Sequence, residues 1–202
     1  YMVDMLEAGC FHAIQDVQCF DLKAVESIRM NPRHREITAS HYASPTAKSS
    51  AASSLDVVVL GATQIDKGFN VNVHTDSQGY IIGGSGGHTD VAECAKLTII
   101  VAPLSRARMP VVVDKVVCVS TPGSSVDMLV TQYGITVNPV HKGLAEKMED
   151  AGLPLKTMEE LVELAYKING IPSLSERNKG RVVAQVLNRD GSLLDEIFEV
   201  RE

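Results

Sequence analysis

The pattern of apolar and polar positions along the first third of the chain predicts helices that alternate with strands. Apolar residues recur at helical spacing over residues 2–7 and 22–29, where Asp21 is placed to cap the second helix. Extended segments are expected at 13–18 and 36–40. Helices that alternate with short strands are typical of a layered α/β domain.

The most continuous apolar run, residues 55–62, predicts a strand that is buried on both faces at the centre of a mostly parallel sheet. The expected fold class is therefore α/β, with a mostly parallel central sheet flanked by helices. Further strands are expected at 97–101, 111–119, 128–131 and 135–137.

The C-terminal part differs in pattern, because it predicts amphipathic helices over 142–151 and 158–168. Thr157 and Glu160 have the spacing of a capping box at the start of the second helix. Asp190 and Gly191 then predict the turn of a hairpin. These elements, which we place in an extension over residues 140–202, carry no evident chemistry.

A glycine run stands between a short extended piece at 79–82 and a helix expected at 90–96, with Thr89 or Asp90 as its N-cap. Its glycines leave backbone amides accessible, so the loop suits an anion or a developing oxyanion. A tight turn without any ligand explains the same residues equally well. The run lacks the Lys-Ser/Thr of a Walker loop and the spacing of a dinucleotide loop. Its members are Gly83, Gly84, Ser85, Gly86, Gly87, His88, Thr89 and Asp90.

The composition argues against some classes of function. A chain of 202 residues with 45% hydrophobic and 22% charged residues is ordinary for a globular protein. Its net charge of −6 and its scattered basic residues argue against binding to nucleic acid or to an anionic membrane. The four cysteines show neither zinc-site nor disulfide spacing, so we expect no metal, and a cytoplasmic location.

Two further segments each allow a structural and a functional interpretation. Residues 40–54 are small and polar, which fits a linker or the wall of a site equally well. Arg106 and Arg108 follow a predicted strand and could meet a carboxylate, although solvated loop charges are the more common outcome.

Taken together, the segments resemble a known family. Residues 57–66, 84–90, 95–96, 99–101 and 126–131 resemble the second half of the CoA-transferase family. Residues 16–21, 37–40 with Tyr42, 99–104 and 110–115 resemble more closely the alpha chains of citrate lyases. The resemblance extends to about Pro139, and this combination is far more specific than the glycine run alone.

The resemblance implies a CoA-transferase-like (NagB-like) fold, with residues 1–202 as its second, C-terminal domain. It implies a transferase that exchanges acetyl for citrate on an acyl-carrier-protein thioester or CoA, giving citryl thioester and acetate. The implied partners are a beta chain, an acyl-carrier gamma chain and a second copy of the chain. No cofactor is tightly bound; the carrier's prosthetic group or CoA is a co-substrate.

The resemblance also assigns site residues. The segment from Gly83 to Asp90 would hold the thioester, with Gly86 and Gly87 as oxyanion-hole candidates. Family members carry a nucleophilic glutamate in a Ser-Glu-Asn-Gly motif, where this chain has Ala-Ser-His-Tyr at 39–42. A covalent glutamyl intermediate is therefore not expected here, and we place Ser40 and His41 in the substrate pocket.

The sequence starts within a predicted helix at Tyr1, so we expect a fragment of a longer chain. Two alternatives to a complete transferase stay open. One is a non-catalytic ligand-sensing domain of related fold, and the other is a structural half that is inactive without the N-terminal domain.

Overall fold

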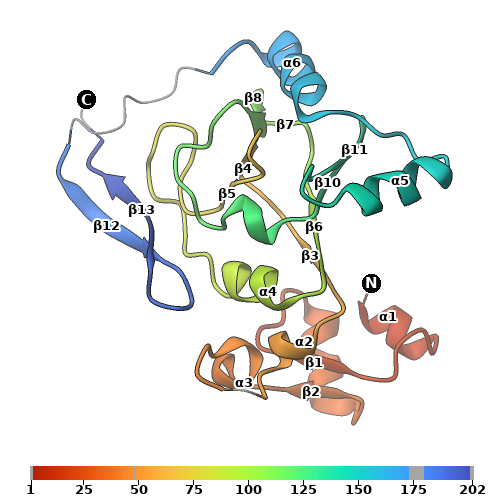
Figure 1. The fold of residues 1–202 in the computed structure, drawn as a ribbon. Helices are drawn as coiled ribbons and strands as arrows, with labels where there is room; N and C mark the ends of the chain where they lie inside the picture. Colours follow the sequence, from red (N-terminus) through yellow and green to blue (C-terminus); the bar gives the residue numbers. More distant parts are fainter. Residues whose placement is uncertain (1, 48, 173–179, 201–202) are drawn as a thin grey trace. The chain divides into compact units, whose positions relative to one another are not determined.

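The computed structural model describes residues 2–47, 49–172 and 180–200, and it confirms a mixed α/β chain (Figure 1). The chain forms two compact units, Tyr1–Ser54 and Leu55–Glu202. The single-domain organisation over 1–202 stays a prediction.

The first unit pairs two short parallel strands with helices. Asp21 caps α2 as predicted, since its Oδ1 accepts a hydrogen bond from the Ala24 amide at 2.8 Å. The parallel register pairs Ile14 with His34 and Asp16 with Glu36. The elements are α1 (Met2–Glu7), β1 (Ile14–Asp16), α2 (Leu22–Met30), β2 (His34–Glu36), α3 (Ala39–Ala43) and the 3-10 turn η1 (Ala51–Ser54).

The strand expected at 36–40 is wrong for most of its length. The paired strand ends at Glu36, and α3 begins at Ala39. Thr38 causes the change, because its hydroxyl accepts a hydrogen bond from the His41 amide at 3.1 Å and so caps a helix. The segment at 40–54 is thus partly helical.

The second unit is built on a four-stranded sheet in the order β11-β10-β6-β3. The pairs β3·β6 and β6·β10 are parallel, and β10·β11 is antiparallel. These strands are β3 (Val57–Leu60), β6 (Leu97–Val101), β10 (Met128–Thr131) and β11 (Gly134–Val137).

The prediction that the 55–62 run forms a central strand, buried on both faces, is wrong in this unit. In the described residues β3 is an edge strand, and Val57 and Val59 are 48% and 61% exposed. The central position belongs to β6, which has a parallel neighbour on each side. The runs that form β3 and β6 are similarly apolar, so the sequence pattern did not indicate which of the two strands is central.

The remaining strands form smaller sheets beside the first. The sheet β5-β4-β9 carries the polar segments that approach the glycine run, and β12·β13 is the predicted hairpin. The strands are β4 (Gln64–Asp66), β5 (Val71–Asn72), β7 (Ser105–Arg106), β8 (Met109–Pro110), β9 (Val112–Val113), β12 (Val182–Leu187) and β13 (Leu193–Phe198).

The strand predicted at 111–119 is confirmed only as β9. Beyond Val113 the backbone bonds to side chains, since the Val116 amide donates to Asp66 Oδ2 at 3.2 Å and the Val117 amide to Gln64 Oε1 at 3.4 Å. Side-chain acceptors therefore replace strand partners there.

Helix α6 (Met158–Asn169) covers the core of the second unit. Thr157 and Glu160 form the predicted capping box, and Leu161 and Ala165 are fully buried. They pack with Ile65, Ile100 and other apolar residues of the sheets. The other helices are α4 (His88–Cys94), α5 (Lys142–Asp150) and the 3-10 turn η2 (Gly123–Ser125).

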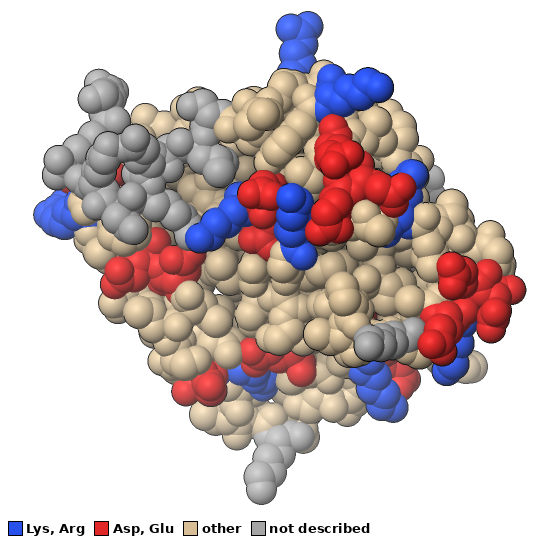
Figure 2. Space-filling view, turned by 45° about the horizontal axis from the view of Figure 1, so that its top comes forward, with Lys and Arg blue, Asp and Glu red and all other residues tan. Residues whose placement is uncertain are grey.

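Charged side chains of both signs are interspersed on the face that Figure 2 shows. The second unit also has exposed ion pairs, such as Lys67 with Asp114 at 2.5 Å and Lys96 with Asp56 at 2.7 Å. Each such pair contributes little to stability. Every helix in the described ranges is too short or too polar to cross a bilayer.

We expect Gly123→Ala to destabilise the second unit. A Cβ at Gly123 would lie 1.8 Å from the Gly68 carbonyl oxygen, so the two backbone segments must separate. We expect a loss of at least about 2 kcal/mol in the free energy of unfolding, measured by urea denaturation. Gly143→Ala is the control, because a Cβ there meets nothing within 4 Å. Equal stability of the two variants would contradict this packing.

Candidate functional site

The glycine run lies between β3 and β6, at the point where α4 begins. Its last part contacts Gly61, which directly follows β3. Since β3 and β6 are parallel and α4 joins the run to β6, the run lies at the carboxyl edge of these strands. Open α/β sheets bind their ligands at this edge.

His88 fixes the end of the run to the sheet. Its Nε2 lies 2.9 Å from the Gly61 carbonyl oxygen, and its Nδ1 lies 2.8 Å from Thr121 Oγ1. A carbonyl oxygen only accepts, so Nε2 carries the proton and Nδ1 accepts from the Thr121 hydroxyl. Burial lowers the pKa of His88, which agrees with a neutral ring.

Thr89 provides a second anchor. Its hydroxyl donates to the Ser120 carbonyl oxygen at 2.5 Å and lies 3.0 Å from Thr121 Oγ1. Ser120 and Thr121 are fully buried. Two consecutive residues of the run are thus fastened to one buried segment from a distant part of the sequence.

The start of the run is fixed by a turn. Asp76 Oδ1 accepts hydrogen bonds from the amides of Gln78 and Tyr80 at 2.9 and 3.0 Å. The Ile82 amide donates to the His74 carbonyl oxygen at 2.8 Å, and His74 Nδ1 lies 2.6 Å from Ser120 Oγ. Ser120 therefore contacts Thr89 in the run and also His74, which holds the residue just before the run.

The apex between these anchors faces solvent. Gly83, Gly84 and Gly86 are exposed, and an added Cβ on any of them meets nothing within 4 Å. In the described residues the amides of Gly84, Gly86 and Gly87 have no hydrogen-bond partner, whereas the His88 amide donates to the Ser85 carbonyl oxygen. Gly86 has φ +56°, a conformation that favours glycine. The apex therefore presents free donors on a fixed base.

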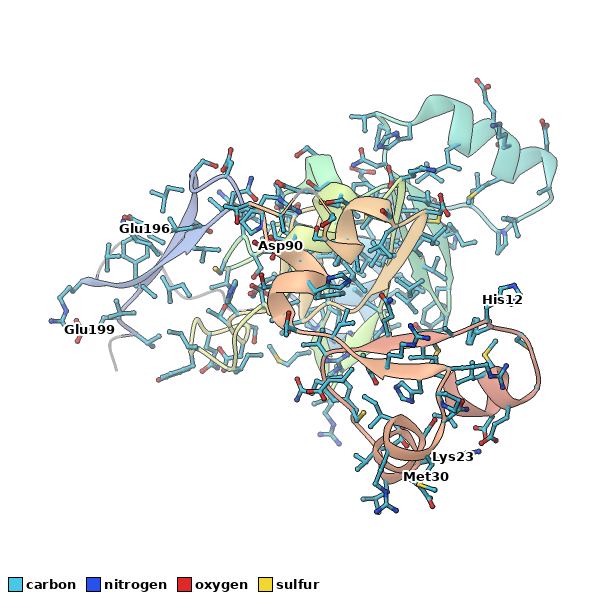
Figure 3. All side chains as sticks on the ribbon, turned by 90° about the horizontal axis from the view of Figure 1, so that it is seen from below. His12, Lys23, Met30, Asp90, Glu196 and Glu199 are labelled. Carbon is cyan, nitrogen blue, oxygen red and sulfur yellow. The ribbon has the colours of Figure 1, made fainter. Side chains whose placement is uncertain are left out.

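The N-cap predicted at Thr89 or Asp90 is wrong. Helix α4 begins at His88 with Gly87 as its cap residue, so Thr89 and Asp90 lie in its first turn. Thr89 is unsuited to capping because its hydroxyl is already bonded to Ser120. Asp90, labelled in Figure 3, is half-buried, and its carbonyl oxygen accepts from Arg189 at 3.0 Å.

Buried polar side chains hold the segment that leads to the glycine run. Asn72 Oδ1 accepts from the amides of His74 and Thr75 at 3.1 Å, and its Nδ2 donates to Gln64 Oε1 at 3.1 Å. Gln64 Nε2 is buried without a partner among the described residues. Asp66 closes a turn, since its Oδ1 accepts hydrogen bonds from the amides of Gly68 and Asn70.

The remaining predicted residues lie elsewhere in the chain. Ser40 and His41 are exposed on α3 in the first unit, and their role in a substrate pocket stays a prediction. Arg106 and Arg108 are exposed in the β7·β8 hairpin, where Ala107 and Arg108 adopt positive φ. His88 is in the loop but buried, so it acts here as an anchor.

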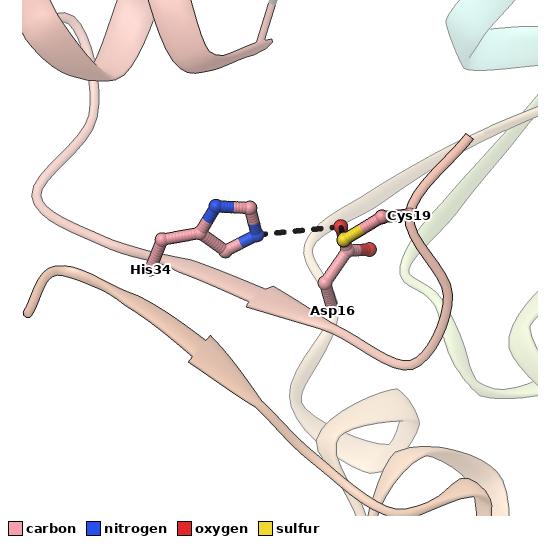
Figure 4. A group of neighbouring side chains, drawn as sticks. All are labelled: Asp16, Cys19 and His34. Carbon is pink, nitrogen blue, oxygen red and sulfur yellow. Dashed lines mark hydrogen bonds and ion pairs between the residues drawn. The ribbon is translucent and has the colours of Figure 1, made fainter. Parts of the chain in front are cut away.

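Sequence reasoning missed a second group of side chains. In the first unit the ligand atoms of Asp16, Cys19 and His34 lie within 4.8 Å of one another (Figure 4). Partial burial raises the pKa of Cys19, and the carboxylates of Asp16, Asp21 and Glu36 raise it further. The thiol is therefore not activated as a nucleophile.

The fold and the loop define a mixed α/β protein that presents free backbone donors at the carboxyl edge of a parallel strand pair. Sites of this class suit anionic and acyl groups. The chain belongs to the citrate lyase alpha subunit family, whose model, described as "Citrate lyase, alpha subunit (CitF)", matches residues 1–200.

Individual relatives agree with this assignment. The citrate lyase alpha chains of Klebsiella pneumoniae and Escherichia coli K12 are each 48% identical, over 99% and 100% of this chain. The chain spans 39% of the length of each. A crystal structure from Streptococcus mutans, described as an alpha subunit of citrate lyase in complex with citrate, superposes with a TM-score of 0.93 at 46% identity. The superposition covers 100% of this chain and 39% of the chain in the Streptococcus mutans structure.

We expect the protein to lose stability as the pH falls below about 6.5, the ordinary pKa of histidine. Burial lowers the folded-state pKa of His88 and of His74, so the unfolded chain binds protons that the folded chain does not. This contribution is complete above the unfolded pKa and declines toward the folded one. Each unit of pKa difference corresponds to about 1.4 kcal/mol.

The measurement is urea unfolding between pH 5 and pH 8. His88→Gln should show a smaller loss at low pH than the parent, whereas His12→Gln, at an exposed position labelled in Figure 3, should keep the parent's dependence. A parental pH dependence in His88→Gln would show that His88 is not the responsible group.

Proposed function

We propose that the chain takes part in the acyl-exchange step of citrate lyase, replacing acetyl by citrate on an acyl-carrier-protein thioester or on CoA. The products are the citryl thioester and acetate. The observation that carries the proposal is the exposed apex of the glycine run, whose amides are free while its two ends are anchored. Membership of the citrate lyase alpha subunit family supports the same reaction.

The fold proposed for this reaction is the CoA-transferase-like (NagB-like) fold, with this chain as its second domain and residues 140–202 as an extension. The parallel pairs β3·β6 and β6·β10 support it, because they provide the sheet edge that carries the loop. The structural neighbour at TM-score 0.93 is described as bound to citrate, which supports a carboxylate substrate for this chain.

The proposed exchange begins when a citrate carboxylate oxygen attacks the acetyl carbonyl carbon, and the carrier thiolate leaves as the mixed anhydride forms. The thiolate then attacks the citryl carbonyl carbon of the anhydride, and acetate leaves. Both steps place negative charge on a carbonyl oxygen. The amides of Gly86 and Gly87 are the candidates to stabilise it, because fixed donors need no reorganisation as charge develops.

The chain's own residues argue for direct exchange within a ternary complex. Helix α3 consists of Ala39, Ser40, His41, Tyr42 and Ala43, and it offers no carboxylate to attack a thioester. Ser40 and His41 are exposed on this helix and are proposed to line the substrate pocket. Their side chains can donate hydrogen bonds to citrate carboxylates.

The proposed co-substrate is the acyl carrier's prosthetic group or CoA, with no tightly bound cofactor. The proposed partners are the citrate lyase beta chain, the acyl-carrier gamma chain and a second copy of the alpha chain, and the proposed location is the cytoplasm. Because the chain spans 39% of its curated relatives, the complete reaction is proposed for the full-length protein.

The decisive experiment is acyl exchange by the full-length alpha chain assembled with its beta and acyl-carrier chains. Acetylated carrier is incubated with labelled citrate, and citryl thioester and released acetate are measured. We expect Gly86→Ala to lower the turnover by about tenfold to a hundredfold, because φ +56° disfavours alanine and the neighbouring amides must shift.

Gly152→Ala is the matched control. Gly152 has φ +71° and open space for a Cβ, so it carries the same kind of strain outside the loop, and we expect unchanged exchange. Equal loss in both variants would indicate a stability effect. Absence of exchange in the parent assembly would refute the proposed function, and citrate binding without turnover would then favour a ligand-sensing role.

A further inference from the structure

Three side chains with different metal-binding atoms converge in the first unit, apart from the glycine run. Asp16 ends β1, Cys19 lies in the loop that follows, and His34 begins β2 (Figure 4). The carboxylate, thiolate and imidazole that they offer are all ligands of zinc in proteins.

We propose that Asp16, Cys19 and His34 form a binding site for a zinc ion. Two of the ligand atoms come from residues of the parallel β1·β2 pair, Asp16 and His34, and the third comes from Cys19 in the loop that directly follows β1. A fourth position is left for water or for a group from another molecule, as in three-ligand zinc sites.

Two of the three distances between ligand atoms match the geometry that zinc requires. Zinc–ligand bonds of about 2.0–2.3 Å place tetrahedral ligand atoms about 3.4 Å apart for oxygen and nitrogen, and about 3.6 Å apart for oxygen and sulfur. His34 Nε2 lies 3.3 Å from Asp16 Oδ2, and Cys19 Sγ lies 3.5 Å from the same oxygen. Two edges of the tetrahedron are thus already formed.

The outer nitrogen of His34 has a partner that suits a metal ligand. His34 Nδ1 lies 3.1 Å from Ser27 Oγ, and Ser27 is buried on α2. Without metal, the hydroxyl donates to Nδ1 while Nε2–H donates to Asp16. With metal on Nε2, the proton sits on Nδ1 and the same hydroxyl accepts it. Ser27 therefore holds the ring in either tautomer, as outer partners of metal-ligating histidines do.

Access and charge also favour a cation. The His34 side chain is 1% exposed, whereas Asp16 is 31% exposed and Cys19 is half-buried, so an ion can enter from one side. Asp21 and Glu36 lie near enough to act on Cys19 electrostatically. Binding releases the thiol proton to solvent, and the site gains a cation among three carboxylates.

The test uses the tag-free, full-length protein titrated with Co²⁺ as a spectroscopic substitute for Zn²⁺. We expect one equivalent of Co²⁺ to produce a thiolate-to-metal charge-transfer band, which Zn²⁺ removes by displacement. Cys19→Ser should lose the band, whereas Cys10→Ser should retain it, because Cys10 lies outside the group. Ser27→Ala keeps all three ligands and should weaken binding by about tenfold to a hundredfold.

A second measurement needs no variant. Peptide-resolved alkylation of the parent protein should show Cys19 protected by stoichiometric Zn²⁺, while the exposed Cys10 reacts as before. A Co²⁺ band that persists in Cys19→Ser, or equal alkylation of Cys19 with and without Zn²⁺, would overturn the proposal.

Discussion

The glycine run depends on the buried hydrogen bonds of His88 and Thr89. These two residues connect the end of β3 at Gly61 with the buried pair Ser120 and Thr121, so segments distant in the sequence meet at one point. Each bond contributes only about 1 kcal/mol net, but a buried polar group left without a partner costs about 1–3 kcal/mol. Displacing the loop would leave these buried groups without partners, so the bonds hold the loop in place.

This arrangement lets the loop be exposed and fixed at once. A run so rich in glycine loses more conformational entropy on ordering than other sequences, so its fixed shape needs support from outside the run. That support comes at its two ends, from the Asp76 turn before it and from His88 and Thr89 after it. Ser120 links the two sides, since its carbonyl oxygen accepts from Thr89 and its hydroxyl lies against His74, whose carbonyl oxygen accepts from Ile82 just before the run. The free amides between them are held in place before any ligand arrives, which is what electrostatic stabilisation of an oxyanion needs.

The sequence predicted local features better than long-range ones. Asp21 and the Thr157–Glu160 pair were recognisable because capping acts over three residues, and both are confirmed. The edge position of β3 was not predictable, since burial of Val57 and Val59 depends on what lies across the sheet rather than on their own apolar character. The importance of Ser120 and Thr121 was equally hidden, because their partners lie at least 31 residues away in the sequence. Asp16, Cys19 and His34 follow no metal-site spacing, because only the β1·β2 pairing brings His34 next to Asp16 and the nearby Cys19.

The chemistry of the loop also limits what it can select. Between Gly83 and Gly87 the chain offers backbone amides and one hydroxyl, that of Ser85, and no cationic side chain. Backbone donors polarise any carbonyl oxygen of suitable position, so in the proposed exchange the run does not distinguish citrate from another carboxylic acid. Discrimination among acids requires groups that contact the distinctive carboxylates and hydroxyl of the substrate. For the proposed reaction, such groups must therefore lie outside the run, and Ser40 and His41 on α3 are the proposed candidates.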